Sequence, residues 1–581
     1  MLPKHPVFVR ILGVISFIML LVGCQEGGTL NPTPLGASTV PGIETASPTS
    51  RITTSSPTDE PITTMDVDPQ QNDIAKYPSG SKVEISFSGP NSKGLEPEIN
   101  PFSLQVDVQV QSPDGKSTIY PAFYDGDGQG SLDGDVWKLR LRPYQEGIWH
   151  YEVHSQDNLL AGTNGSFEVV SNPDCKPENV NEANLFCKGT LEYVGGHYLQ
   201  FQDGEYWIKT GLDDPENFLG TAFGDWEAKR AQIDLLSEMG VNSIYVITNN
   251  IDGDRKDTWP WVGENEAQAK SNRDRFDVAR LAEWEDFFSY AQQKGIVLHI
   301  VFNDDSAWRG YDEQLYIREM IARFAHHPGI IWNVGEEANE IFTDREQLAF
   351  AAKIHELDPY QHPVTVHRKS PWPFLGDREF DSTSIQIGDG GADFSTTRLM
   401  DYNLIVNEHR ERSSQRGHSI PIMIDETPRI TVVDPDVRQK FRTQVLYPIF
   451  LAGGNFELHF RDAYGQTGSV RIEDLEPLIL DMVTLRKFLE DLPFPNMEPC
   501  NQLLSELDNI CFGEVGQTYA VYLPYGGSEE VDLSISEVVF EQDWFNPGTG
   551  EITEAGSIQG GQVRSFTAPD ERDWVLLLDA R

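Results

Sequence analysis

Two short apolar segments of the chain each end in a pair of acidic residues. Residues 330–337 read Ile-Ile-Trp-Asn-Val-Gly-Glu-Glu, and residues 420–426 read Ile-Pro-Ile-Met-Ile-Asp-Glu. Short apolar runs of this kind predict buried strands, so the acids stand at strand ends. Two carboxylates brought together there can divide the acid, base and nucleophile roles in hydrolysis of a glycosidic bond. Glu337 and Glu426 are therefore the first candidates for catalytic residues.

Strand-like and helix-like segments alternate from about residue 186 to residue 497. Helix-like segments such as 229–239 and 276–294 stop at a glycine, and an apolar run follows each. About eight such units over roughly three hundred residues predict one (β/α)8 barrel, whose active site lies at the C-terminal strand ends. A doubly wound open sheet competes less well, because no glycine-rich phosphate loop follows the first strand. The predicted strands are residues 206–209, 241–247, 296–302, 330–334, 363–367, 382–387, 420–424 and 449–460.

Alternating apolar and polar residues flank the predicted barrel on both sides. Between residues 79 and 172, short alternating runs are separated by turns rich in Asp, Gly and Pro, which predicts an Ig-like β-sandwich. The same pattern returns over residues 498–581 and predicts a C-terminal β-sandwich. The expected architecture is therefore multidomain, with a TIM barrel between two β-sandwiches.

The start of the chain has the features of a targeting segment. Lys4 and Arg10 accompany an apolar run over residues 11–21, and Val-Gly-Cys follows. This pattern resembles the signal peptide and lipobox of bacterial lipoproteins over residues 1–24, which implies lipidation of Cys24 and anchoring to the cell envelope, at the surface or in the periplasm. An ordinary secretory signal is the alternative. Residues 25–78, rich in Ser, Thr and Pro, predict a disordered linker.

Charge and cysteine content restrict the partners of the chain. The formal net charge of −46 over 581 residues would repel phosphates, so we exclude nucleic acid. If Cys24 is lipidated, the other four cysteines form two close pairs, and we expect the disulfides Cys175–Cys187 and Cys500–Cys511 in an exported protein. No Cys and His cluster has zinc spacing, so we expect neither metal nor cofactor, and a monomer.

Several segments resemble secreted bacterial barrels related to glycoside hydrolase clan A. They are residues 209–219, 276–284, 321–328 and 332–339 in the barrel, residues 120–128 and 142–149, which resemble an Ig-like domain of unknown function, and residues 519–527 and 544–551, which resemble a domain labelled "putative collagen-binding". The resemblance implies a retaining glycoside hydrolase acting on poly- or oligosaccharide. Glu337 would be the acid/base and Glu426 the nucleophile, with carboxyl groups about 5 Å apart; a wider gap would imply inversion.

Glu336 departs from the pattern of that clan, which usually has Asn immediately before the acid/base. An ionised carboxylate only accepts hydrogen bonds, so the usual contact with the sugar 2-hydroxyl is in doubt. An adjacent carboxylate is also expected to raise the pKa of Glu337 and help it act as an acid.

Polar and aromatic residues near the other strand ends are candidates for substrate binding, because they suit sugar hydroxyls and sugar faces. For each one singly, a structural hydrogen bond or a core position is an equal alternative. Besides Glu336, the candidates are Asn249, Trp261, Asn303, Asp304, Trp308, His367, Gln386, Glu457 and His459.

Two other functions remain open at the level of sequence. The chain could be a non-catalytic carbohydrate- or matrix-binding protein. The resemblance of its C-terminal domain to a domain labelled "putative collagen-binding" is the reason for this alternative. The chain could also be a metal-assisted hydrolase that uses His299 and acidic neighbours, although the lack of a close His-X-His pair makes this the weakest hypothesis.

Overall fold

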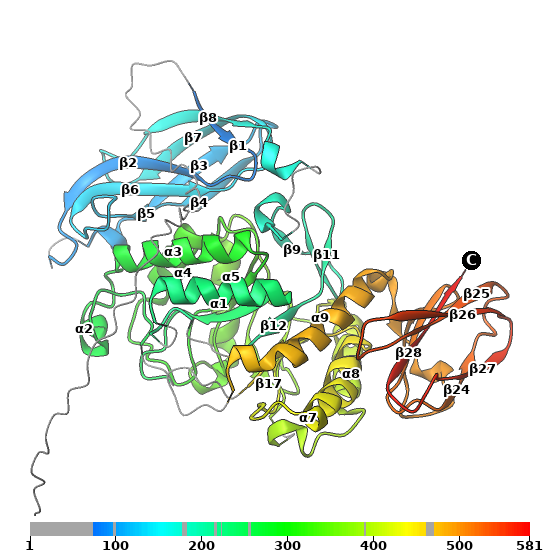
Figure 1. Cartoon of the computed structure of the whole chain (residues 1–581). Coiled ribbons are helices and arrows are strands. Elements are labelled where there is room, and N and C mark those ends of the chain that lie inside the picture. The colour runs from blue at the N-terminus through cyan, green and yellow to red at the C-terminus, as the bar shows by residue number, and fades with distance from the viewer. Residues whose placement is uncertain are drawn as a thin grey trace, which may run out of the picture. The chain divides into compact units, whose positions relative to one another are not determined.

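The computed structural model of the chain describes residues 74–96, 100–176, 183–213, 218–221, 224–253, 257–388, 391–460 and 470–580. The predicted signal peptide, Cys24 and nearly all of the predicted linker lie outside these residues. Within them, no helix is long and apolar enough to cross a membrane. They form a parallel barrel flanked by an N-terminal and a C-terminal β domain, as predicted (Figure 1).

The N-terminal β domain contains two sheets, with strand orders β1-β8-β7-β3-β4 and β2-β6-β5. Side chains of β3 alternate, with Val106, Val108 and Val110 buried between more exposed polar residues. The domain begins at Ala75, before the predicted boundary at residue 79, because β1 pairs with the distant strand β8, a contact that local patterning does not reveal. The strands are β1 Ala75–Pro78, β2 Val83–Ser92, β3 Val106–Gln111, β4 Ser117–Pro121, β5 Phe123–Tyr124, β6 Gly134–Leu141, β7 Gly147–Ser155 and β8 Asn164–Val170.

The barrel sheet is parallel throughout and has the order β16-β15-β14-β13-β12-β20-β19-β18-β17. The predicted fifth strand is interrupted at Val366 and forms two parts, β16 and β17. β16 pairs with β15, and β17 pairs with β18. Eight strand positions therefore form a nearly closed ring. The strands are β12 Thr210–Leu212, β13 Ser243–Ile247, β14 Val297–Val301, β15 Ile330–Asn333, β16 Val364–Thr365, β17 His367–Lys369, β18 Ser384–Gln386, β19 Met423–Glu426 and β20 Asn455–Leu458.

Helices connect the barrel strands, and most of the longer ones begin at a side chain that caps their free N–H groups. Asp225, Asp277 and Asp312 each accept such a hydrogen bond, and Thr343 forms a capping box with Glu346. The helices are α1 Trp226–Met239, α2 Glu266–Ser271, α3 Val278–Gln293, α4 Glu313–Phe324, α5 Asp344–Leu357, α6 Asp401–Gln415, α7 Pro435–Lys440, α8 Tyr447–Phe450 and α9 Glu476–Glu490.

Three predicted strand positions were wrong in their limits. Residues 206–209 were predicted as the first barrel strand, but Tyr206–Trp207 is β11 of a separate antiparallel sheet with β10 (Leu199–Phe201) and β9 (Leu191–Tyr193). Both β11 and β12 are short apolar runs, and periodicity does not say with which strand each one pairs. The seventh strand begins at Met423, after Pro421, which has no N–H for a ladder. In the eighth segment, residues 447–450 are helical and only β20 is a strand.

The C-terminal β domain contains a sheet of order β21-β22-β23-β28-β25-β26 and the pair β24-β27. Both predicted disulfides are present: Cys175–Cys187 follows the N-terminal domain, and Cys500–Cys511 ties the chain beside β21 to β22. Disulfides of this kind are typical of extracellular or periplasmic proteins. The strands are β21 Glu498–Pro499, β22 Ile510–Glu514, β23 Thr518–Leu523, β24 Ser528–Asp532, β25 Val539–Phe545, β26 Ile552–Gln559, β27 Val563–Thr567 and β28 Trp574–Ala580.

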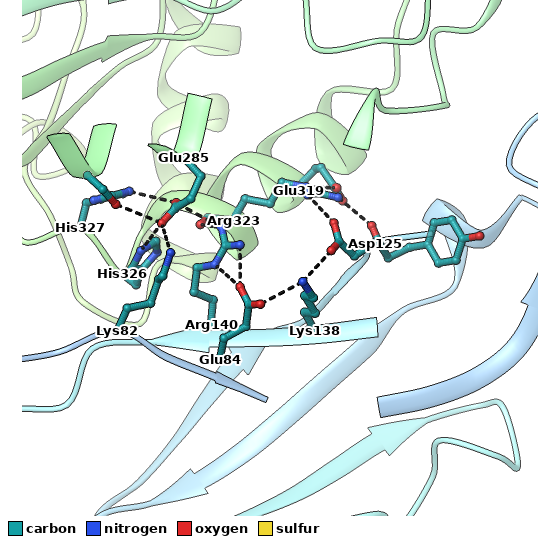
Figure 2. Close-up of polar contacts among 12 residues, drawn as sticks. Lys82, Glu84, Asp125, Lys138, Arg140, Glu285, Glu319, Arg323, His326 and His327 are labelled. Atoms are coloured by element: carbon teal, nitrogen blue, oxygen red, sulfur yellow. Dashed lines mark hydrogen bonds and ion pairs between the residues drawn. The ribbon is translucent and has the colours of Figure 1, made fainter. Parts of the chain in front are cut away.

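Paired charges connect the N-terminal domain to the barrel (Figure 2). Glu285 of α3 lies 3.1 Å from Arg140 of β6 and 2.9 Å from Lys82. His326 and His327, after α4, also contact its carboxylate, each at 3.1 Å. Burial alone would raise the pKa of Glu285, but its partners, Arg140 first among them, together outweigh burial and hold that pKa well below its ordinary value. The contact between the N-terminal domain and the barrel therefore contains the buried, ionised carboxylate of Glu285, which has several partners.

Candidate active site

The two candidate glutamates meet at the C-terminal ends of the barrel strands. Glu426 is the last residue of β19 and pairs in register with Gln386, the last residue of β18. The Gln386 side-chain amide donates to Glu426, and its interaction with Glu337, which follows β15, lowers the pKa of Glu337. Gln386 thus lies beside both carboxylates. Glu337 keeps 17% of its side chain exposed and Glu426 keeps 16%, so both remain accessible from solvent.

Glu337 has an unusual backbone conformation. Its φ of 32° and ψ of 44° lie in the left-handed region, and Ala338–Glu340 follows as one turn of 3₁₀ helix. An L-residue with a long side chain rarely adopts this conformation, because its Cβ crowds the backbone. Strained residues of this kind concentrate at functional sites. The turn leads Glu337 out of the strand toward Gln386.

Lys369, the last residue of β17, covers Glu337 from the solvent side. Its Nζ lies 3.0 Å from Glu337 Oε1, and 59% of the lysine side chain is exposed. Burial raises the pKa of Glu337, but hydrogen bonds from Lys369 and Gln386 and the charge on Lys369 lower it below the ordinary value. This result differs from the predicted rise. The prediction relied on Glu336 as a sequence neighbour, whereas Glu336 turns to other partners.

Glu426 has the opposite electrostatic balance. Burial raises its pKa, and the charges on Glu336 and Glu337 raise it further. His459 and His367 oppose this rise, with His459 Nδ1 3.6 Å from Oε1 and His367 Nε2 3.8 Å from Oε2. Two imidazoles are therefore placed to stabilise an ionised Glu426.

Glu336 points toward the interior of the barrel. Only 5% of the residue is exposed. Its carboxylate accepts a hydrogen bond from the Tyr245 hydroxyl of β13 and contacts His367 Nδ1. Its partners are therefore buried protein groups.

A layer of buried charge lies next to this pair, with Lys209 at its centre. Lys209 Nζ is 3.0 Å from Asp425 Oδ1, 3.0 Å from Glu457 Oε2 and 3.0 Å from His299 Nδ1. The side chains of Lys209, Asp425, Glu457 and His299 have no exposed area. Glu457, a predicted substrate residue, is thus held inside the barrel by an ammonium group.

The remaining predicted residues belong to a second hydrogen-bonded group. Asn249 Nδ2 donates to Asn303 Oδ1 at 3.1 Å, and Asn303 Nδ2 donates to the Val334 carbonyl at 3.2 Å. Trp261 is fully buried, with ring centroids 5.0 Å from Tyr311 and 6.1 Å from the partly exposed Trp308. Asp304 is 1% exposed. The structure thus gathers Glu336, His367, Gln386 and His459 around the two glutamates and places Trp261, Asn249, Asn303, Asp304 and Trp308 in the loops after β13 and β14.

Metal-assisted chemistry at His299 does not fit these contacts. His299, Asp425 and Glu457 are close enough to hold an ion. However, Lys209 Nζ already contacts all three, and a cation in their midst would meet its positive charge. The described residues therefore give this alternative no support.

Three functional candidates were missed by sequence reasoning: Lys369, Lys209 and Tyr245. Lys369 had a signal, because it lies two residues after His367 and alternate residues of a strand share a face. Lys209 and Tyr245 lie in or beside short apolar runs that predict strands. Nothing in those runs indicates their partners, which lie on strands distant in the sequence.

Two segments of the chain match known families. Residues 78–156 match the family described as "Domain of unknown function (DUF5060)", and residues 505–579 match "Putative collagen-binding domain of a collagenase". These matches confirm the resemblances predicted for the two flanking domains. No curated protein sequence matches the chain.

The fold is similar to those of solved glycoside hydrolases. A "putative glycoside hydrolase" from Bacteroides vulgatus superposes with a TM-score of 0.66 at 16% identity, over 87% of this chain and 100% of that chain. A family 5 glycoside hydrolase from the same organism gives 0.53 at 17%, over 68% and 93%. A structure named "Glycoside hydrolase" gives 0.51 at 18%, over 68% and 97%. At these identities the similarity establishes the fold alone: a parallel barrel with flanking β domains.

Proposed function

We propose that the protein is a retaining glycoside hydrolase that acts on poly- or oligosaccharide. The observation that carries the proposal is the pair Glu337 and Glu426, which lie at or just after the ends of the fourth and seventh strand positions and are close enough for the charge of Glu337 to raise the pKa of Glu426. Both carboxylates are accessible, as attack on a sugar requires. The similar folds of solved glycoside hydrolases support the same reaction class.

In this mechanism Glu426 attacks the anomeric carbon while Glu337 protonates the departing oxygen; Glu337 then activates water to release the sugar from Glu426. In the free protein the pKa of Glu337 is lowered and that of Glu426 is raised, whereas the reaction needs Glu337 protonated and Glu426 ionised. Substrate binding can reverse the order of the two pKa values. When a leaving-group oxygen replaces the exposed Lys369 beside Glu337, the pKa of Glu337 rises. His367 and His459 meanwhile stabilise the Glu426 carboxylate.

The test is turnover of a panel of aryl glycosides by the wild type and by Glu337→Ala and Glu426→Ala. We expect both variants to lose turnover of any aryl glycoside that the wild type hydrolyses. Glu356→Ala, which removes an exposed carboxylate on α5, is the matched control. Unchanged turnover in either single variant would reject the role of that glutamate.

A non-catalytic matrix-binding protein is the second candidate, and the match of residues 505–579 to a collagen-binding description favours it. In that case the full chain would bind collagen or polysaccharide in a pull-down assay with unchanged affinity in Glu426→Ala, and no glycoside would be hydrolysed.

We also propose that the protein is exported and lipid-anchored through Cys24, as a monomer with the domain limits predicted above, except that the N-terminal domain starts at Ala75. The two disulfides support an oxidising compartment. In a bacterial host, Cys24→Ser should move the protein from the membrane fraction to the soluble fraction; an unchanged membrane fraction would contradict lipid anchoring.

A further inference from the structure

The environment of Glu336 differs from that of a sugar-binding residue. Its carboxylate contacts the Tyr245 hydroxyl and His367 Nδ1, and 5% of the residue is exposed. A residue that recognises a sugar hydroxyl must present a polar atom to the cleft, and Glu336 directs its oxygens inward. A different role is therefore needed for it.

His367 connects Glu336 to the proposed nucleophile. The ring is fully buried, its Nδ1 faces Glu336, and its Nε2 lies 3.8 Å from Glu426 Oε2. A neutral imidazole carries a proton on only one nitrogen, so the lone pair of its other nitrogen would lie beside a carboxylate. An imidazolium is protonated on both nitrogens, and its positive charge is attracted to both carboxylates. The geometry therefore favours a charged ring.

The surrounding charges support the same protonation state. Burial lowers the pKa of His367, but the charge and hydrogen bond of Glu336, followed by the charges of Glu426 and Asp425, raise it to about 9. Lys209 is already 3.0 Å from both Asp425 and Glu457. His367 is thus the cation placed between Glu336 and Glu426.

The other groups that face His367 do not compete for this role. His299 of β14 stays neutral, because burial and Lys209 hold its pKa well below the ordinary value. The ring of Tyr245 of β13 lies at 74° to that of His367, with centroids 6.2 Å apart. Glu457 of β20 is attracted to His367 but pairs with Lys209. His459 approaches Glu426 from its other oxygen.

We propose that Glu336 and His367 are positioning residues for the reaction: Glu336 holds His367 as an imidazolium, and His367 holds Glu426 oriented and ionised for attack. This inference rests on the proposed function. It gives the departure from Asn at position 336 a physical reason, since an amide there would bring no charge to His367. Glu336, His367 and Glu426 are also close enough to hold a metal ion. An imidazolium has no lone pair for a metal, so a proton occupies this group instead.

The direct test is histidine NMR on the full chain labelled with ¹³C and ¹⁵N in histidine, with His367→Gln to assign the signals. We expect the wild-type His367 ring to stay cationic up to a midpoint near pH 9. In Glu336→Gln its midpoint should fall below the ordinary value of about 6.5. Glu336→Asp, which keeps the charge, should retain a raised midpoint even if Glu336→Gln is poorly folded. A neutral His367 at pH 7 in the wild type, or an unchanged midpoint in Glu336→Gln, would overturn the inference.

The pH profile of kcat/KM for an aryl glycoside that the wild type hydrolyses tests the catalytic part. On its acid side, kcat/KM rises as the nucleophile ionises in the free protein. Glu336→Gln removes a charge that raises the pKa of Glu426, but it also removes the His367 charge, which lowers that pKa by more. The acid limb should therefore move to higher pH, and Glu336→Asp should restore it. A protein that hydrolyses a glycoside but has a neutral His367 would overturn the positioning role of Glu336 and His367 and leave the proposed function standing. A protein with a cationic His367 and no hydrolysis of any glycoside would overturn the proposed function and, with it, the catalytic role of the pair.

Discussion

At the scale of single residues, the site depends on how each carboxylate is held. Glu337 has a left-handed backbone and an exposed lysine partner, whereas Glu426 is held in a regular strand between two histidines. The first arrangement suits a group that changes its protonation state during a reaction, and the second suits a group that must remain an anion.

The backbone of Glu337 leads to a prediction about stability. Glycine has no Cβ to crowd a φ of 32°, so Glu337→Gly should be more stable than Glu337→Ala by about 1 kcal/mol. Urea unfolding of the two variants measures the difference. At Glu340, which lies within the 3₁₀ turn, the order should reverse, with Ala more stable than Gly. Equal stability of Glu337→Gly and Glu337→Ala would show that the left-handed conformation carries no strain.

Lys369 leads to a prediction about pH. In the free protein Glu337 ionises below Glu426, so the form with Glu337 protonated and Glu426 ionised is a minority, and its amount on the alkaline side increases with the pKa of Glu337. Lys369 lowers that pKa, and Lys369→Met should therefore move the alkaline limb to higher pH. Arg368→Met is the matched control, because Arg368 pairs with Asp344 at 2.8 Å and should leave the limb in place. The assay uses an aryl glycoside that the wild type hydrolyses, and a limb that moves downward would contradict the assignment of Glu337.

At the scale of elements, the barrel strands are joined by buried charge as well as by their ladders. Lys209, just before β12, contacts Asp425 of β19 and Glu457 of β20. Removing one partner of a buried ion pair leaves the other charges without compensation, which is strongly destabilising.

Lys209→Met should therefore destabilise the protein by on the order of 3 kcal/mol. Lys188→Met is the control, since Lys188 pairs with the half-exposed Glu205 and should change stability by about 1 kcal/mol or less. Circular dichroism during urea unfolding measures both. Equal stability of Lys209→Met and Lys188→Met would contradict a stabilising role for the buried charges around Lys209.

The same elements explain how much could be predicted. Apolar runs predicted six of the barrel strand positions within a few residues, and the strand ends pointed to Glu337 and Glu426, which lie beside Gln386. The first strand was misplaced because β11 and β12 are alike in composition and differ only in their partners. The contacts of Glu336 with Tyr245 and His367 were not predictable, because they depend on which distant strands become neighbours and on the direction of each side chain.

At the scale of the whole molecule, the N-terminal domain provides positive charges that pair with a buried acidic residue of the barrel. Arg140 of β6 pairs with Glu84 at 2.7 Å and with Glu285 of the barrel helix α3 at 3.1 Å. Lys138 and Arg323 extend the network through Asp125 (Figure 2). Such an arrangement couples the stability of the two domains.

Arg140→Met should therefore lower the thermal stability of the barrel as well as that of its own domain, by on the order of 3 kcal/mol in total. Differential scanning calorimetry of the full chain measures the effect. Lys76→Met, which removes an exposed pair with Glu168 on the same domain, should leave the transitions unchanged. Identical scans for Arg140→Met and Lys76→Met would contradict the coupling.

The most direct test of the central claim is azide rescue of Glu426→Ala on an aryl glycoside that the wild type hydrolyses. Azide can enter the space left by the carboxylate and attack the anomeric carbon, while Glu337 remains in place. We predict that azide restores turnover and yields a glycosyl azide with the anomeric configuration opposite to that of the substrate. Full activity of Glu426→Ala without azide, or a glycosyl azide of retained configuration, would contradict double displacement at Glu426.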